Sequence, residues 1–220
     1  MTLHDSQLTP THEDFAGLNI GCGSNVVPGW TNCDRTFGSA TFCIKRLIWP
    51  ARFRRFKRGI CLGMDARQRF PFDSNTIDYV YEQHMLYAFD LAEAKRFLRE
   101  SFRVLKPGGR IRVNEDDLRA IVMDYLQGGQ GLAEFANQSS YVRANAIQRG
   151  ADALSAVAKK WRSCKWFYDA ESLIGQLEDV GFKAVERRAF RQSRLPSIDL
   201  LEKDNRQSVL GQVWVEATKP

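Results

Sequence analysis

The stretch Gly17-Leu18-Asn19-Ile20-Gly21-Cys22-Gly23-Ser24 decides the fold, because a short apolar run passes directly into a glycine turn. The apolar run predicts a buried strand over residues 17–20. Glycines at positions 21 and 23 let the backbone turn, and they let it approach a ligand that a Cβ would block. Gly-x-Gly alone also fits a plain tight turn, so the interpretation depends on the strands that come after it in the chain.

Four further strands are expected, and each leads into polar residues. They cover residues 30–33, 60–64, 76–81 and 110–113, and they lead into Asp34, Asp65, Glu82 and residues 114–117, respectively. Two last strands are expected over residues 183–190 and 212–217.

Helices are expected between these strands. Apolar residues at helical spacing predict a helix over residues 91–105, which Lys-Pro-Gly-Gly at 106–109 ends. Asp169 can cap a second helix over residues 170–180. The alternation predicts an α/β fold, with a mostly parallel seven-stranded sheet and helices on both faces. Ligands of such sheets bind at the carboxyl ends of the strands, which is where the polar residues gather.

Composition places the chain among ordinary globular proteins. Of its 220 residues, 44% are hydrophobic, which is enough to form a buried core. The length predicts a single domain, which we place over residues 17–220 after an arm over residues 1–16. No apolar run approaches the roughly 20 residues of a membrane span, and no secretory signal opens the chain. We therefore expect a cytoplasmic protein. Five cysteines without a Cys-x-x-Cys spacing and only three histidines argue against disulfides and against a metal site.

Positive charge is concentrated in one segment. The net charge is +6, but Arg35 to Met64 contains eight Lys and Arg residues and no acid, so the rest of the chain is slightly acidic. This predicts a basic insertion over residues 35–59 that binds an anionic group of a small molecule, a lipid-linked carrier or a membrane surface. A solvated helix with its aromatic side chains docked on the core explains the same run equally well. Nucleic acid is not expected, because no recognisable binding motif accompanies the cations.

The polar strand ends suit a nucleoside without pyrophosphate. A carboxylate at Asp34 can accept hydrogen bonds from a ribose diol. A dinucleotide fingerprint needs a third glycine and an acid about 20 residues onward, whereas Asp34 follows Gly23 by eleven positions. Asp65, with Met64 and Ala66, stands where an adenine edge would lie, although a turn carboxylate is the alternative.

These residues resemble a known family. Leu18-Asn19-Ile20-Gly21-Cys22-Gly23 and Pro28-Gly29-Trp30-Thr31-Asn32-Cys33-Asp34 are similar to the first motif and second-strand acid of class I S-adenosylmethionine-dependent methyltransferases, most closely the small bacterial type 11 group. Residues 70–78, 97–109, 166–169 and 215–217 resemble further elements of that group. The resemblance implies a Rossmann-like fold, S-adenosylmethionine as cofactor, and methyl transfer. Asn19 stands where the family often has an acid, and Tyr87-Ala88 where it often has Glu-His.

The resemblance and the strand ends together give the candidate cofactor-binding residues, which are Asn19, Gly21, Cys22, Gly23, Asp34, Met64, Asp65, Ala66, Glu82 and Gln83. Cys22 is interpreted as a small spacer between the glycines. No metal is required for methyl transfer from a sulfonium.

Three residues are candidates for the catalytic base. His84 is the only histidine within the expected domain, and it follows the fourth strand, although a structural histidine is an equal alternative. Asp116 and Asp117 follow the fifth strand, where capping of a helix before Leu118 is the alternative. We expect methyl transfer to oxygen of a small-molecule or glycan acceptor, covered by a helical insertion over residues 119–165. The alternatives are a non-enzymatic module that binds RNA or an anionic membrane, and an NAD-dependent dehydrogenase.

Overall fold

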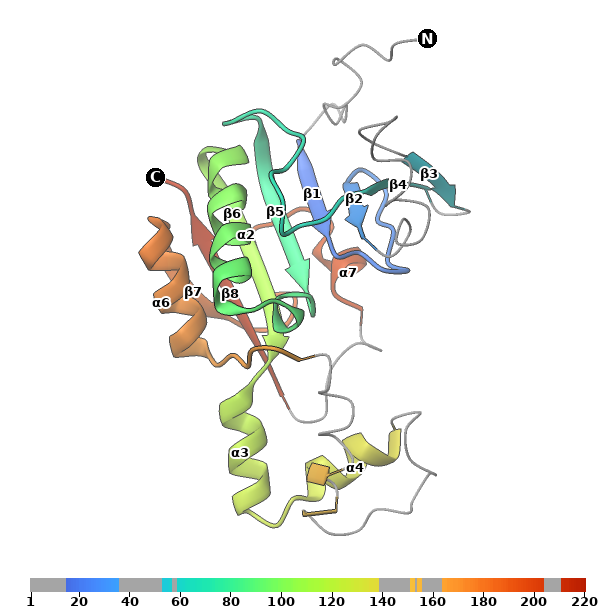
Figure 1. Cartoon of the computed structure of the whole chain (residues 1–220), viewed down its shortest axis with the longest axis vertical. Helices are drawn as coiled ribbons and strands as arrows, with labels where there is room; N and C mark the ends of the chain where they lie inside the picture. The colour runs from blue at the N-terminus through green and yellow to red at the C-terminus, as the bar shows by residue number, and fades with distance from the viewer. Residues whose placement is uncertain are drawn as a thin grey trace.

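The computed structural model describes residues 15–35, 53–56, 59–138, 151–152, 154–155, 164–203 and 211–220, and within these ranges it forms one eight-stranded sheet (Figure 1). The order is β3-β4-β2-β1-β5-β6-β8-β7. The strands are β1 (Gly17–Ile20), β2 (Thr31–Asp34), β3 (Phe53–Phe56), β4 (Gly59–Gly63), β5 (Ile77–Gln83), β6 (Leu105–Asp116), β7 (Lys183–Arg188) and β8 (Gln212–Thr218).

The seven predicted strands are all present, and the sheet is mostly parallel, as expected. Strands β4, β2, β1, β5 and β6 pair in parallel, whereas β8 is antiparallel to both β6 and β7. The eighth strand, β3, lies within the predicted basic insertion and pairs antiparallel with β4. For residues 53–56 the helical alternative was therefore wrong. Residues 36–52 and 57–58, with most of the basic run, lie outside the described residues, as does the arm up to residue 14.

Helices α2 (Leu91–Val104) and α6 (Ala170–Val180) cover one face of the sheet. Their buried side chains form one core with alternate strand residues such as Leu18, Val80 and Val113. Side chains of successive strand residues point to opposite faces. Tyr79 and Tyr81 thus lie on the other face, where they pack with the short helix α7 (Ile198–Leu201).

Local signals explain where these helices begin and end. Asp90 and Asp169 each form a capping box with the third helical residue, which satisfies otherwise unpaired amides. Gly181 ends α6 in a left-handed conformation, with φ 112°, that glycine adopts without strain. The 170–180 helix and its two boundary residues are therefore as predicted.

Two helices extend beyond the carboxyl edge of the sheet. β6 leads into α3 (Leu118–Leu126), and α4 (Gln130–Gln138) follows after Gly128 and Gly129, which both have positive φ (Figure 1). They belong to the predicted 119–165 insertion, most of whose remainder lies outside the described residues. Among the described helices, none is long and apolar enough to cross a membrane.

Candidate functional site

The glycine turn after β1 is open on one side. Gly21 and Gly23 have φ of 71° and 52°, and the amides of Gly21 and Cys22 donate to the Cys33 carbonyl at 2.8 and 3.1 Å. A Cβ on Gly21 would lie 3.0 Å from Met85 side-chain atoms, whereas a Cβ on Gly23 would meet nothing within 4 Å. Gly21 therefore packs against the loop after β5, and Gly23 leaves its backbone open to a ligand.

Asp34 at the end of β2 is joined to this turn. Its Oδ2 accepts the Gly23 amide at 2.8 Å, and the residue is 8% exposed. The sequence predicted both residues as neighbours at one edge, and the structure brings them together. An anchored carboxylate beside an open glycine backbone fits an adenosyl group, because the carboxylate can accept the ribose hydroxyls while the backbone lies close to the sugar.

The end of β4 supplies Met64, Asp65 and Ala66. The Met64 amide donates to the Asp34 carbonyl at 3.2 Å, so this edge adjoins the same corner. Asp65 Oδ2 lies 2.7 Å from Arg67 Nη2, and the hydrogen bonds from Arg67 lower the pKa of Asp65. Asp65 also accepts the Arg67 amide at 3.1 Å, as a turn carboxylate does. Asp65 is thus an ionised acid at the predicted adenine position, and the amide and guanidinium of Arg67 hold its side chain in place.

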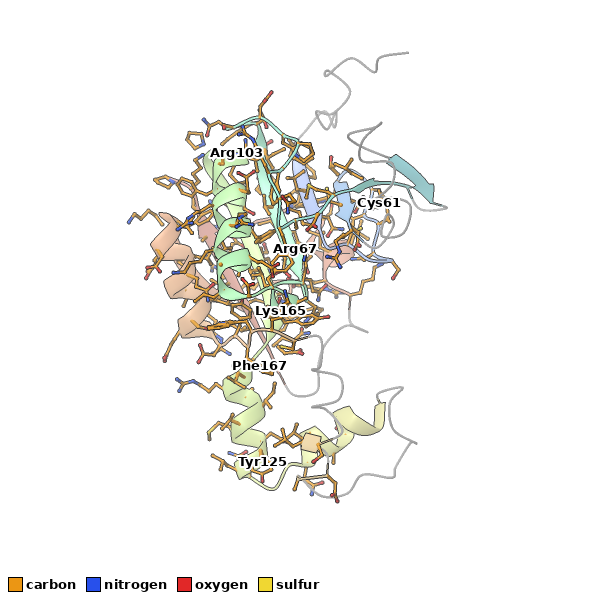
Figure 2. The ribbon with its side chains drawn as sticks, viewed as in Figure 1. Cys61, Arg67, Arg103, Tyr125, Lys165 and Phe167 are labelled. Atoms are coloured by element: carbon orange, nitrogen blue, oxygen red, sulfur yellow. The ribbon has the colours of Figure 1, made fainter. Side chains whose placement is uncertain are left out.

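Arg67 and Lys165 converge on the first turn of α2. Arg67 Nη1 lies 3.4 Å and Lys165 Nζ 2.9 Å from the carboxylate of Glu93. Figure 2 shows the two labelled cations near the start of α2. They join residues 65–67 and the chain before Tyr168 to the same helix.

Glu82, the penultimate residue of β5, is fully buried. Its Oε1 accepts the amides of Met85 and Leu86 at 2.6 and 3.1 Å, which orders the short turn η3 (Leu86–Ala88). Burial raises the pKa of Glu82 to about 7. Gln83 is 7% exposed, and its Oε1 has no hydrogen-bond partner within the described part of the chain. An unpaired acceptor of this kind fits a cationic or hydroxyl-bearing ligand at this edge.

Glu115 is a site residue that the sequence analysis did not select. It is 1% exposed, and its carboxyl group is near enough to that of Glu82 for each to alter the pKa of the other. Its Oε1 also accepts the Tyr87 amide at 3.1 Å. Burial, followed by the charge of Glu82, raises the pKa of Glu115 well above its ordinary value. The two carboxyl groups therefore hold a proton between them near neutral pH.

His84, which directly follows β5, is contacted by residues of β6 and β8. Its Nε2 lies 2.6 Å from Gln212 Nε2 in β8, and its Nδ1 lies 3.8 Å from Asp116 Oδ1 and 4.0 Å from Glu115 Oε2. The side chain is 25% exposed. Because Gln212 Nε2 can only donate, His84 Nε2 accepts in the neutral ring, and the hydrogen is on Nδ1, the nitrogen on the side of Asp116 and Glu115. Gln212 carries no sequence signal, because only the pairing of β6 with β8 brings it to this point.

The two candidate aspartates differ in what they contact. Asp117 caps α3 by accepting the Arg119 and Ala120 amides, and its Oδ2 lies 3.0 Å from Arg187 Nη2. Asp117 therefore serves as the N-cap of α3, and its carboxylate is occupied by two backbone amides and by Arg187. Asp116 instead faces His84 and is 30% exposed.

Asn19 and Cys22 are buried and have local partners. Asn19 Nδ2 donates to the Asn25 carbonyl and to Asn32 Oδ1, at 2.9 and 2.8 Å. Cys22 Sγ lies 3.6 Å from Cys61 Sγ, and this thiol contact, together with burial, raises the pKa of Cys22. A raised pKa keeps the thiol protonated and unreactive, which agrees with its interpretation as a spacer. Direct cofactor contact by either residue stays a prediction.

No group of three or more His, Cys, Asp or Glu residues within the described ranges could hold a metal ion. The chemistry at this edge is that of carboxyl groups, one imidazole and a glycine backbone with open space beside it. Such a set can bind a nucleoside and move a proton.

Comparisons with known proteins agree with this geometry. Residues 18–113 match a family profile described as a methyltransferase domain. The structure is similar to a SAM-dependent methyltransferase from Thermotoga maritima, with 19% identity, a TM-score of 0.53, and 98% of this chain and 86% of that chain covered. It is also similar to one from Archaeoglobus fulgidus, with 15% identity, a TM-score of 0.51, and 93% and 86% covered. No curated protein sequence matches the chain. Neither the profile nor the fold supports the dehydrogenase or the non-enzymatic module.

Proposed function

Because this chain is a class I S-adenosylmethionine-dependent methyltransferase, we propose that it moves the methyl group to an oxygen of a small-molecule or glycan acceptor. The observation that carries the proposal is the position of His84, whose Nδ1 lies about as close to Asp116 as to Glu115, at 3.8 and 4.0 Å. A hydroxyl acceptor needs a base, and a histidine flanked by carboxylates is one.

In this proposal, different residues at the carboxyl edge contact different parts of the cofactor. Asp34 would accept the ribose hydroxyls, and the backbone at Gly23 would lie against the sugar. Asp65 would face the adenine, and the unpaired Oε1 of Gln83 would accept from the amino-acid end. When bound, the cofactor supplies a methyl group on a positively charged sulfur. The remaining task of the chain is to align the acceptor oxygen and to take its proton.

His84 takes that proton in the proposed mechanism. Because Gln212 Nε2 can only donate, the 2.6 Å contact makes Nε2 the acceptor nitrogen of the neutral ring, with the hydrogen on Nδ1. We therefore assign proton uptake to Nε2, with the acceptor hydroxyl taking the place of the Gln212 amide at that nitrogen. The imidazolium that forms is stabilised by the neighbouring carboxylate of Asp116. Base catalysis of this type contributes about 10²–10⁴-fold to the rate.

The charge around His84 also favours one kind of acceptor. Glu82, Glu115 and Asp116 make the surroundings of the imidazole acidic, so a neutral hydroxyl is better accommodated at the reacting position than a carboxylate or phosphate. We further propose that any anionic or lipid-linked part of the acceptor is bound away from His84, by the basic run between residues 35 and 59.

Two measurements test the proposal. Calorimetry with S-adenosylmethionine should give the same affinity for wild-type protein and for His84→Ala, because His84 is assigned to the acceptor and not to the cofactor. Methyl transfer from labelled cofactor, screened against sugars, phenols, amines and carboxylates, should favour hydroxyl compounds and fall by about 10²-fold or more in His84→Ala. Equal turnover in the variant removes His84 as base, and transfer to amines alone removes oxygen as the target.

A further inference from the structure

The connection from β7 to β8 crosses the sheet face opposite α2 and α6. Residues 189–203 of this connection, which include α7, pack Leu195 and Leu201 against Val27 and Trp30 from the β1–β2 connection. The 189–203 segment therefore lies directly on the part of the chain that comes after the glycine turn.

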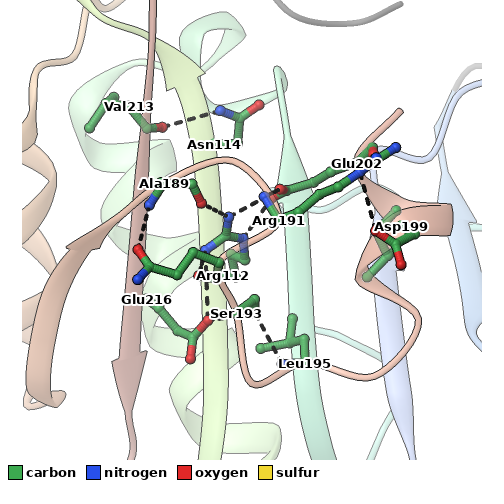
Figure 3. Close-up of polar contacts among 12 residues, drawn as sticks. Arg112, Asn114, Ala189, Arg191, Ser193, Leu195, Asp199, Glu202, Val213 and Glu216 are labelled. Carbon is green, nitrogen blue, oxygen red and sulfur yellow. Dashed lines mark hydrogen bonds and ion pairs between the residues drawn. The ribbon is translucent and has the colours of Figure 1, made fainter. Parts of the chain in front are cut away.

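A buried ion pair between Arg112 and Glu202 fixes the 189–203 segment to β6 (Figure 3). Arg112 in β6 and Glu202 are both fully buried, with Arg112 Nε 2.6 Å from Glu202 Oε1 and Nη2 3.1 Å from Oε2. Arg112 also donates to the carbonyls of Gln192 and Ala189, at 3.2 and 2.9 Å. The Arg191 amide donates to Glu202 Oε2 at 2.6 Å. The segment is thus bound to a central strand at several points.

The other contact reaches the glycine turn through Asn25. Asn25 is 2% exposed, and its Nδ2 donates to the carbonyls of Leu200 and Leu201 at 3.1 and 3.0 Å. These carbonyls belong to the last residues of α7, which have no partner within the helix. The Asn25 amide in turn donates to the Cys22 carbonyl at 2.8 Å. A continuous set of bonds therefore joins Arg112, through α7, to the residue between the two glycines.

These bonds are needed because the β1–β2 connection lacks a helix. Residues 21–30 contain no helix, so no helical backbone bonds hold the glycine turn in place. Backbone bonds to Cys33 and the side chain of Asp34 hold it from the side of β2, and the Asn25 side chain links it to α7.

We propose that Asn25 and the 189–203 segment are positioning elements for the cofactor: they hold the 21–23 turn in the conformation that binds S-adenosylmethionine, although they lie on the far face of the sheet. The inference depends on the cofactor site alone and not on the identity of the acceptor. It also implies the reverse effect, since coupling between two sites is reciprocal: cofactor binding stabilises α7.

Hydrogen exchange on the unmodified protein tests the reverse effect without any variant. Addition of S-adenosylmethionine should slow exchange in peptides that cover residues 198–202, where the Leu201 and Glu202 amides donate to Ser197 and Ile198. Unchanged exchange in these peptides, with protection elsewhere at the glycine turn, overturns the proposal.

A matched pair of variants tests the forward effect. Asn25→Ala removes side-chain bonds to the end of α7, whereas Lys219→Met removes comparable bonds, at 2.7 and 2.8 Å, to the Phe102 and Leu105 carbonyls at the end of α2. Asn25→Ala should weaken calorimetric cofactor affinity by about 10-fold, within the usual range for coupled sites, and should abolish the protection of residues 198–202. Lys219→Met should leave both unchanged. Equal effects of the two variants on affinity mean that Asn25 serves stability alone.

Discussion

Replacing Glu82 with glutamine should remove the loss of stability that the titration of Glu82 causes as the pH rises. Glu82 is fully buried, and burial raises its pKa from an ordinary 4.5 to about 7. A carboxyl group with a raised pKa binds its proton more tightly in the folded state than in the unfolded state. Its contribution to stability is therefore complete below about pH 4.5 and is lost as the pH rises through 7. The shift corresponds to about 3 kcal/mol at pH 8, since one pKa unit is about 1.4 kcal/mol.

Glu82→Gln keeps an oxygen that can accept the Met85 and Leu86 amides, and it keeps a donor toward Glu115, but it carries no titrating group. Urea unfolding at a series of pH values from 5 to 8 should show the variant gaining stability over wild type by about 3 kcal/mol across that interval. Glu100→Gln is the control, because the hydrogen bonds from Arg103 lower the pKa of Glu100 and leave it ionised throughout this interval. A constant difference between Glu82→Gln and wild type refutes the assignment of the shared proton to Glu82 and Glu115.

Three further changes test other parts of the molecule. Asp34→Ala should weaken S-adenosylmethionine binding by about 10-fold or more in calorimetry, because hydrogen bonds to a charged group are worth about 1.5–3 kcal/mol, and unchanged affinity would contradict the ribose assignment. Gln212→Leu should lower turnover while cofactor affinity stays constant, because it frees the ring of His84 to rotate; a loss of affinity instead would place Gln212 at the cofactor. Arg112→Met should cost about 3–5 kcal/mol in thermal unfolding, because Glu202 is left buried without its partner, and a loss below about 1 kcal/mol would show that the pair is not buried in solution.

Most of the fold could be predicted because its signals are local. The 170–180 helix is set by a capping aspartate and a terminal glycine that adjoin it in sequence. The strand ends at residues 20 and 34 are set by the glycine turn and by Asp34, which directly follows the buried Cys33. β3 was missed, because its four residues are mostly basic and aromatic and form a strand only through pairing with β4.

The candidate site was predicted less completely, because its electrostatics depend on pairs that are distant in sequence. The approach of Glu115 to Glu82, and of Gln212 to His84, results from the order β5-β6-β8 and not from any local pattern. Asp117 shows that one sequence position can fit two roles. Its sequence position after β6 suits a base, but the same position suits a helix cap, and the amides of α3 together with Arg187 occupy the carboxylate.

The amide at position 19 belongs to the same far-face network. Asn19 Nδ2 donates to two acceptors, the Asn25 carbonyl and Asn32 Oδ1, and the side chain is buried. An aspartate here would place an oxygen against two oxygens, with no donor between them and little water to screen the charge, which is costly in a buried site. The acid that the resembled family often has at this position is therefore incompatible with this chain's own way of holding its glycine turn. The acids at this edge belong to neighbouring strands instead, with Asp34 bonded to the glycine turn and Glu82 near the end of β5.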